Sequence, residues 1–246
     1  MYAKERTGMG AKTEGYRRTY VPGMGHDRLL PLYDPLHRLL GTASIHRQLV
    51  DIADVRPGQR VLEVGCGTGN LALLAKRLHP QAEIIGLDPD PKALARARRK
   101  AGHKALPVQL DRGFAEDLPY PDASFDRVLS AFMFHHLGPD EKEEALREAR
   151  RILKSGGFLH LLDFGGAKER PGGFMARLRH RHERLRDDFG DRIPTLMQEA
   201  GFAEPTEVAH RVTKVLGRVT YYRATVPRSE SVAAQHGADP RKEARR

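Results

Sequence analysis

Apolar positions alternate between strand-like runs and helix-like spacing from residue 60 onward. Short apolar runs predict five strands, at 60–64, 83–87, 105–110, 127–132 and 158–162. Amphipathic segments predict helices at 71–78, 91–100, 141–153, 174–189 and 193–200. Gly156 and Gly157 mark the predicted end of the helix at 141–153. Because most of these strands are separated by helices, the pattern favours a parallel sheet with right-handed crossovers.

The two ends of the chain follow different patterns. Residues 1–28 are polar and rich in glycine and basic residues, which predicts a disordered basic arm. Leucine and isoleucine recur at helical spacing through 29–56, which predicts a helical segment before the first strand. Two β-rich runs, 206–216 and 219–226, predict an antiparallel hairpin through Gly217. The polar residues 227–246 predict a disordered tail.

Composition narrows the class of protein. The 246 residues are 39% hydrophobic and 30% charged, as expected for a soluble globular protein. They contain no apolar run of about 18 residues that could span a membrane. Cys66 is the only cysteine, so we expect no disulfide framework and no cysteine-based metal site, and we predict no metal ligands. We expect a cytoplasmic enzyme, whose net charge of +10 suits nucleic acid, an anionic membrane, an anionic substrate or solubility alone.

A glycine-rich loop follows the first predicted strand and opens the first predicted helix. Gly65, Gly67 and Gly69 allow a sharp turn and a close approach of the backbone to a ligand. A dinucleotide-binding loop would need a glycine where Asn70 stands. The carboxylate of Glu63 just before the loop would repel a pyrophosphate. It suits a ligand that carries an amine and a sulfonium, which favours S-adenosylmethionine over NAD.

Asp88 ends the second predicted strand, about 20 residues beyond the glycine loop. An acid in this place can accept hydrogen bonds from both hydroxyls of a ribose. The alternative is a helix cap or a turn residue, and the glycine loop favours the ribose role.

These motifs resemble the class I S-adenosylmethionine-dependent methyltransferases over residues 30–215. The matching segments are 61–70, 86–90, 115–126 and 152–163. Within this class, Tyr33-Asp34 and the segment 41–47 are similar to the ubiquinone/menaquinone C-methyltransferase branch. The resemblance implies an α/β, Rossmann-like, doubly wound fold with a mostly parallel sheet, a C-terminal antiparallel hairpin and an N-terminal helical lid. The lid would be 29–56, and 57–226 would be the S-adenosylmethionine-binding methyltransferase domain.

The resemblance also implies roles for individual residues. The glycine loop would hold the methionine part of the cofactor, Asp88 the ribose, and the loop at Ala115 and Glu116 the adenine. Phe114 stands where relatives often carry a polar residue, so we place the adenine edge against the Ala115 backbone and the Glu116 side chain. The predicted cofactor-binding residues are Tyr33, Glu63, Gly65, Cys66, Gly67, Gly69, Asp88, Pro89, Ala115, Glu116 and Ser130. Cys66 has no basic neighbour in the sequence, so we expect a small buried filler and not a nucleophile.

Candidate acid–base residues follow the fourth and fifth predicted strands. His135 and His136 come just after the fourth strand, and Asp163 ends the fifth. The carboxyl ends of such strands face the ligand crevice of a doubly wound sheet. We therefore predict these three as catalytic residues, with packing or capping as the alternative for each.

The sequence thus predicts transfer of the methyl group of S-adenosylmethionine to a small or amphiphilic acceptor. A quinol precursor, a phenol and a lipid head group all remain open. The quinone branch usually carries an Arg-Asn pair near the end of strand four, and Phe134-His135-His136 stands there instead, which argues against a quinone.

The alternatives are a non-catalytic binder of the same cofactor and an RNA methyltransferase. A nucleic-acid acceptor is disfavoured because no Asn-Pro-Pro-Tyr motif follows strand four. The arginine-rich helix at 174–189 suggests peripheral contact with an anionic membrane, with a solvated surface helix as its alternative.

Overall fold

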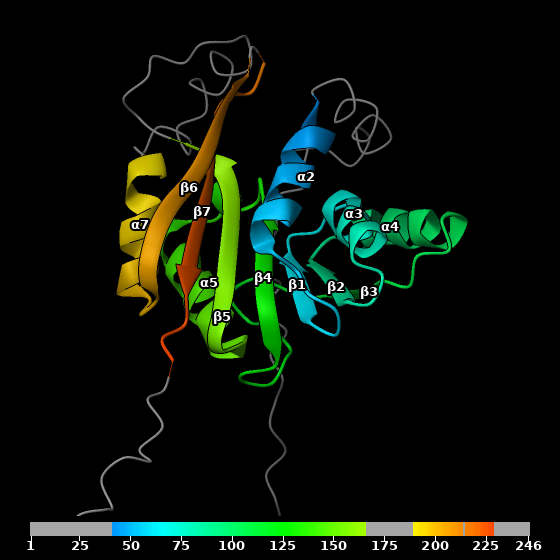
Figure 1. The fold of residues 1–246 in the computed structure, drawn as a ribbon, viewed down its shortest axis with the longest axis horizontal. Coiled ribbons are helices and arrows are strands. Elements are labelled where there is room, and N and C mark those ends of the chain that lie inside the picture. Colours follow the sequence, from blue (N-terminus) through cyan, green and yellow to red (C-terminus); the bar gives the residue numbers. More distant parts are fainter. Residues whose placement is uncertain (1–40, 166–188, 214, 229–246) are drawn as a thin grey trace, which may run out of the picture.

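The protein folds around one seven-stranded sheet flanked by helices on both faces (Figure 1). The computed structural model describes residues 41–165, 189–213 and 215–228. The strands are β1 (Arg60–Val64), β2 (Glu83–Asp88), β3 (Gln109–Arg112), β4 (Phe125–Ala131), β5 (Leu153–Phe164), β6 (Ala203–Thr213) and β7 (Gly217–Thr225). The helices are α2 (Thr42–Ala53), α3 (Asn70–Leu78), α4 (Pro91–His103), the 3-10 turn η2 (Phe134–His136), α5 (Pro139–Ile152) and α7 (Phe189–Glu199).

The strand order β3-β2-β1-β4-β5-β7-β6 confirms the predicted doubly wound architecture. The strands β3, β2, β1, β4 and β5 are parallel, whereas β7 pairs antiparallel with both β5 and β6. The order reverses at β1, so the carboxyl ends of β1 and β4 meet at the switch point of the sheet. A ligand crevice is expected there.

Side chains alternate between the two faces of the sheet and build two apolar clusters. One face, with Val61, Leu129 and Leu162, packs against α2 and α3. The other, with Leu62, Val128 and Leu161, packs against α5 and α7. This arrangement explains why the central strands are apolar on both faces.

The helix α2 belongs to the first of these clusters. Ile45 and Leu49 are fully buried, and the Tyr221 hydroxyl donates to the Ile45 carbonyl at 3.1 Å. At the end of the helix, Arg127 Nε donates to the Ala53 carbonyl at 2.8 Å. The part of the predicted lid that the structure describes therefore packs into the core. The rest of the predicted lid, the arm 1–28 and the tail beyond 228 lie outside the described residues.

The predicted starts of the third and fifth strands were wrong. The third strand was expected at 105–110 but begins at Gln109, because the chain before it closes the end of α4. There Ala105 adopts a left-handed φ of 51°, the Leu106 N–H donates to the Ala101 carbonyl, and Pro107 has no N–H to offer a neighbouring strand.

The fifth strand was expected at 158–162, but β5 begins at Leu153. The helix before it ends at Ile152, one residue from its predicted end, and Gly156 and Gly157, which we expected to mark that end, lie inside β5. The Gly156 N–H donates to the Val226 carbonyl, and the Val226 N–H donates to the Gly157 carbonyl. Leu153 itself pairs with Phe125 in β4, so β5 begins there.

The predicted hairpin is confirmed as β6 and β7, with Gly217 as the first residue of β7. The predicted basic helix at 174–189 lies outside the described residues, apart from Phe189, which begins α7. Within 41–165, 189–213 and 215–228, no helix has the length and apolar character needed to cross a membrane.

Candidate functional site

The glycine loop turns the chain sharply between β1 and α3. Gly65, Gly67 and Gly69 all adopt positive φ, at 75°, 52° and 76°. Side-chain-bearing residues rarely take this conformation, which explains the three glycines. The N–H groups of Gly65 and Cys66 both donate to the Leu87 carbonyl, at 2.8 and 3.0 Å, so the loop is attached to the end of β2.

Two of these glycines also lie too close to neighbours to carry a side chain. A Cβ on Gly65 would lie 2.7 Å from Met133 Cβ, which brings the chain after β4 directly against the glycine loop. A Cβ on Gly69 would lie 2.9 Å from Ala97 Cβ in α4. The loop is therefore held between the segment after β4 on one side and α4 on the other.

Asp88 ends β2, as predicted, and its carboxylate is bound to the glycine loop. Asp88 Oδ2 accepts from the Gly67 N–H at 2.7 Å, and Oδ1 accepts from the Asp90 N–H at 2.9 Å. Burial raises the pKa of Asp88 to about 6, while these two N–H groups act in the opposite direction. The remaining lone pairs of the Asp88 carboxylate can still accept a hydrogen bond from a ribose hydroxyl, but the carboxylate also holds the glycine loop in place.

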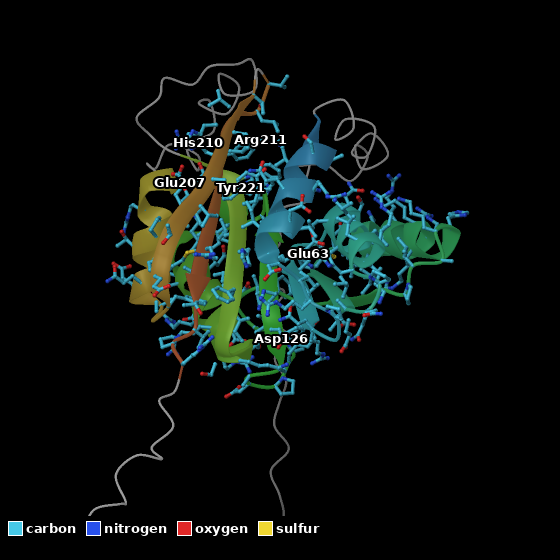
Figure 2. All side chains as sticks on the ribbon, in the orientation of Figure 1. Glu63, Asp126, Glu207, His210, Arg211 and Tyr221 are labelled. Carbon is cyan, nitrogen blue, oxygen red and sulfur yellow. The ribbon has the colours of Figure 1, made fainter. Side chains whose placement is uncertain are left out.

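Glu63 is a buried carboxylate at the carboxyl half of β1, labelled near the centre of the molecule in Figure 2. Its Oε2 atom has no hydrogen-bond partner among the described residues. Burial raises the pKa of Glu63 well above its usual value, with the Ala72 N–H in α3 and the Lys100 cation opposing this shift. A buried acceptor without a partner is costly, so this position favours a ligand with a cationic or N–H group.

Cys66 packs as a small apolar side chain. It lies in a cluster with Leu94, Ala97 and Leu110, and a Cβ on Gly86 would come within 2.9 Å of its sulfur. Burial raises the pKa of the thiol well above its usual value, and the Glu63 carboxylate acts in the same direction. The thiol therefore stays protonated at neutral pH, as a filler would.

The remaining predicted cofactor residues that the structure describes lie in β4 and in the loops after β2 and β3. Ala115 is buried and Glu116 half-buried in the loop where Phe114 and Asp117 form a β-bridge. The Pro89 carbonyl accepts from Arg112 Nε at 3.3 Å. Ser130 is buried in β4, and its hydroxyl has no hydrogen-bond partner among the described residues. The predicted residue Tyr33 lies outside the described residues.

His135 and Asp163 form a close pair at the carboxyl edge of β4 and β5. His135 Nδ1 lies 2.7 Å from Asp163 Oδ1, and the His135 backbone N–H donates to Asp163 Oδ2 at 3.0 Å. The Phe164 N–H also donates to Asp163 Oδ1, at 2.7 Å. Burial alone would raise the pKa of Asp163, but His135 and these hydrogen bonds lower it below its usual range.

The ionised Asp163 fixes the tautomer of its partner. A carboxylate only accepts hydrogen bonds, so Nδ1 of His135 must carry the proton and Nε2 has a free lone pair in the neutral ring. This arrangement is that of a general base held by an acid.

His136 lies beside this pair, with its ring centroid 4.0 Å from that of His135 and its ring plane tilted by 40°. Loss of surrounding water lowers the pKa of His136 to about 4, and the neighbouring His135 adds to the shift. Of the two predicted histidines, His135 is the one hydrogen-bonded to the Asp163 carboxylate, so its ring is the better oriented to act as a base.

Sequence reasoning missed two neighbours of the site. Met133 carries the contact between the glycine loop and the segment after β4, and Phe132 adopts a positive φ of 54°. No sequence pattern marks either residue, because both features depend on how β4 ends against β5. The N-cap of α4 does have a signal, since Asp90-Pro91 is a common way to begin a helix.

Comparison with known proteins adds a domain assignment. Residues 61–157 match the family described as a methyltransferase domain. The chain is 42% identical over 139 residues to a demethylmenaquinone methyltransferase of Thermus thermophilus, covering 55% of this chain and 62% of the relative. It is 36% identical over 162 residues to the ubiquinone/menaquinone biosynthesis C-methyltransferase UbiE of Bordetella avium, covering 64% and 62%. The chain spans about three fifths of the length of these relatives.

Solved structures of similar fold support the same architecture. An S-adenosylmethionine-dependent methyltransferase of Aquifex aeolicus matches with a TM-score of 0.58 at 20% identity, covering 74% of this chain and 89% of that one. The [4+2]-cyclase SpnF matches with a TM-score of 0.63 at 19% identity, covering 76% and 82%. At these identities the likeness concerns the fold alone, and the cyclase illustrates that one fold hosts different reactions.

Proposed function

We propose that this chain is an enzyme that methylates a quinone-type acceptor. It would do so with a class I S-adenosylmethionine-dependent methyltransferase domain of the kind found in the ubiquinone/menaquinone branch. The observation that carries the proposal is the contact between two halves of the site. Met133 joins the glycine loop to the turn that bears His135, which is bound to Asp163. A cofactor loop and a general base thus share one edge of the sheet.

The residues around the glycine loop fit S-adenosylmethionine. The Oε2 atom of Glu63, which has no hydrogen-bond partner among the described residues, suits the cationic amino-acid end of this cofactor, and Asp88 suits the ribose hydroxyls. Gly67, where a Cβ would meet open space, would let the backbone of the loop come close to the ligand, with Ala115 and Glu116 at the adenine. When bound, the cofactor supplies an electrophilic methyl group for an in-line displacement.

The protein would contribute orientation and one proton transfer. His135 Nε2 would accept the proton of an acceptor hydroxyl as the acceptor becomes a nucleophile. Asp163 would keep Nδ1 protonated and stabilise the imidazolium that forms, which makes it a positioning residue. Positioning of the acceptor beside the cofactor site would supply a further large part of the rate.

The proposal of a quinone-type acceptor rests on the relatives, because the matched proteins include demethylmenaquinone and 2-phytyl-1,4-naphtoquinone methyltransferases. The missing Arg-Asn pair argued against this acceptor. His135 lies in the turn where that pair would stand, and Asp163, at the end of the neighbouring strand β5, would hold it there as a base. We therefore favour the quinone-type acceptor over a phenol or a lipid head group.

The test has two stages. Calorimetric titration with S-adenosylhomocysteine and with NAD should show binding of the first alone. Incubation with methyl-labelled S-adenosylmethionine and a panel of a 1,4-naphthoquinol, a simple phenol and phosphoethanolamine should label the naphthoquinol. Labelling of another acceptor alone would contradict the quinone assignment, and binding of NAD alone would contradict the cofactor.

Peripheral contact with an anionic membrane stays a prediction, because the basic helix at 174–189 that suggested it is not described apart from Phe189. Cosedimentation with anionic and neutral vesicles tests it. Binding that is stronger to anionic vesicles and weakens with salt would support the contact, and equal or absent binding would exclude it.

A further inference from the structure

Four rings form a continuous row along the carboxyl edge of the sheet, from α2 to η2. The His46 ring centroid lies 6.2 Å from that of Phe132, and Phe132 lies 5.2 Å from Phe164. Phe164 in turn lies 5.0 Å from His135, edge to face. We call His46, Phe132, Phe164 and His135 the aromatic row. It connects a core helix to the residue that we propose as the base.

The backbone at Phe132 places the middle of this row. Its φ of 54° lies in the left-handed region, which a bulky residue seldom adopts. The Phe132 N–H still donates to the Leu162 carbonyl at 2.8 Å, so pairing with β5 continues up to this residue. The chain then turns into η2, which carries His135. Unfavourable backbone conformations of this kind persist where surrounding contacts enforce them, and they cluster at ligand sites.

The rings of the aromatic row are inclined to one another. The angle between ring planes is 39° for His46 and Phe132, 44° for Phe132 and Phe164, and 62° for Phe164 and His135. None of these pairs is stacked in parallel, so no ring fully covers the face of its neighbour. Phe132, Phe164 and His135 are only half-buried, whereas His46 is buried against the core. The row therefore presents partly accessible aromatic surface beside His135.

We infer that the aromatic row is the acceptor subsite, that it takes a planar conjugated ring, and that Phe132 is its main specificity-determining residue. The inference rests on the proposed function and names the residues that would select the acceptor. Aromatic surfaces favour a flat ring by offset or edge-to-face contact, and a saturated ring of the same skeleton gains much less from them. A ring held against Phe132 and Phe164 would lie next to His135.

The experiment measures binding without turnover. Menadione, a flat naphthoquinone, and the saturated, non-planar decalin dione of the same skeleton are titrated into the full chain, with and without S-adenosylhomocysteine. The parent should bind menadione more tightly than the decalin dione. Phe132→Leu should weaken menadione binding about tenfold, which corresponds to the loss of a good aromatic contact. The same variant should leave binding of the decalin dione within about twofold.

Two variants control for the fold and for the ring. Phe158→Leu removes a half-buried phenyl ring from the middle of β5, six residues before Phe164, and should leave menadione binding unchanged. Phe132→Tyr keeps an aromatic ring at the key position and should retain most of the affinity. Thermal unfolding and affinity for S-adenosylhomocysteine report whether each variant keeps the domain intact.

The results separate this inference from the proposed function. Menadione binding within about twofold of the parent in Phe132→Leu, or an equal loss in Phe158→Leu, would overturn the inference and leave methyl transfer unaffected. Absence of methyl transfer with Phe132-dependent menadione binding would reject the proposed function and keep the subsite. A parent that binds the decalin dione as tightly as menadione would also overturn the inference.

Discussion

His135 is bound twice by Asp163, once through its ring and once through its own backbone. The ring Nδ1 lies 2.7 Å from one carboxylate oxygen, and the backbone N–H donates to the other at 3.0 Å. The acid therefore sets both the position of the turn and the tautomer of the ring. Since Asp163 is buried at the end of β5 and His135 follows β4, the pairing of these two strands assembles the proposed base.

The pairing of His135 with Asp163 predicts losses of kcat of different size in three variants. His135→Gln should lower kcat about a hundredfold or more, because the base is removed. Asp163→Asn should lower kcat about tenfold or more, because the amide can donate to Nδ1 and reverse the tautomer. His136→Gln should lose less than either. Initial rates with saturating labelled cofactor measure all three.

The matched control for these variants is His210→Gln, a histidine on the exposed side of β6 that pairs with Glu207 (Figure 2). It should keep the parent rate. The account of the base is wrong if His135→Gln stays within threefold of the parent while the protein remains folded.

The glycine loop predicts a contrast between two alanine substitutions. Gly58 and Gly65 have almost the same φ, 76° and 75°, but a Cβ on Gly58 meets open space whereas one on Gly65 meets Met133. Gly58→Ala should cost about 1 to 2 kcal/mol of stability, from the backbone alone. Gly65→Ala should cost clearly more and lose at least tenfold in affinity for S-adenosylhomocysteine. Chemical unfolding and calorimetry check the two values; equal costs would show that the close approach is absent.

The raised pKa of Asp88 predicts a pH dependence of stability. Because its pKa rises from 3.8 to about 6 on folding, the folded state binds the proton more tightly. The resulting stability is fully present below about pH 4 and is lost as the pH rises through about 6, by about 3 kcal/mol. In Asp88→Asn this part of the loss should vanish. Urea unfolding of both proteins between pH 4 and pH 7 measures it, and parallel curves would contradict the prediction.

Cys66 should be inert in the native protein. Its thiol is buried and its pKa is raised, so a thiol-specific reagent should react slowly at pH 7.5 until the chain is unfolded. Cys66→Ala should keep most of the parent turnover at some cost in stability, because the side chain fills space against Gly86. Rapid labelling of the folded protein would contradict its role as a filler.

The sequence predicted most of the fold because the central strands are short apolar runs bounded by clear turn residues. The strand β1 matches its predicted bounds, and the glycine loop lies where its motif placed it. The predicted starts of β3 and β5 were wrong, since both are decided by hydrogen bonds to distant or preceding segments: Leu106 to Ala101, and Gly156 to Val226. Local patterns carry no information on such contacts.

The individual residues of the site could be predicted from the sequence, but the contacts between them could not. His135 and Asp163 were predicted separately, and only the register of β4 and β5 shows that they form a pair. The second role of Asp88, as an anchor of the glycine loop, was likewise not visible in the motif. The left-handed conformation of Phe132 has no sequence signal, because a glycine or asparagine would be expected there.

The central claim is that this domain moves a methyl group, and one measurement tests it directly. The purified chain is incubated with methyl-deuterated S-adenosylmethionine and a reduced 1,4-naphthoquinol, and the naphthoquinol is analysed by mass spectrometry. The account predicts a naphthoquinol product that carries the deuterated methyl group, formed in step with S-adenosylhomocysteine. A chain that binds S-adenosylhomocysteine, and binds the naphthoquinol, yet yields no labelled product would contradict it.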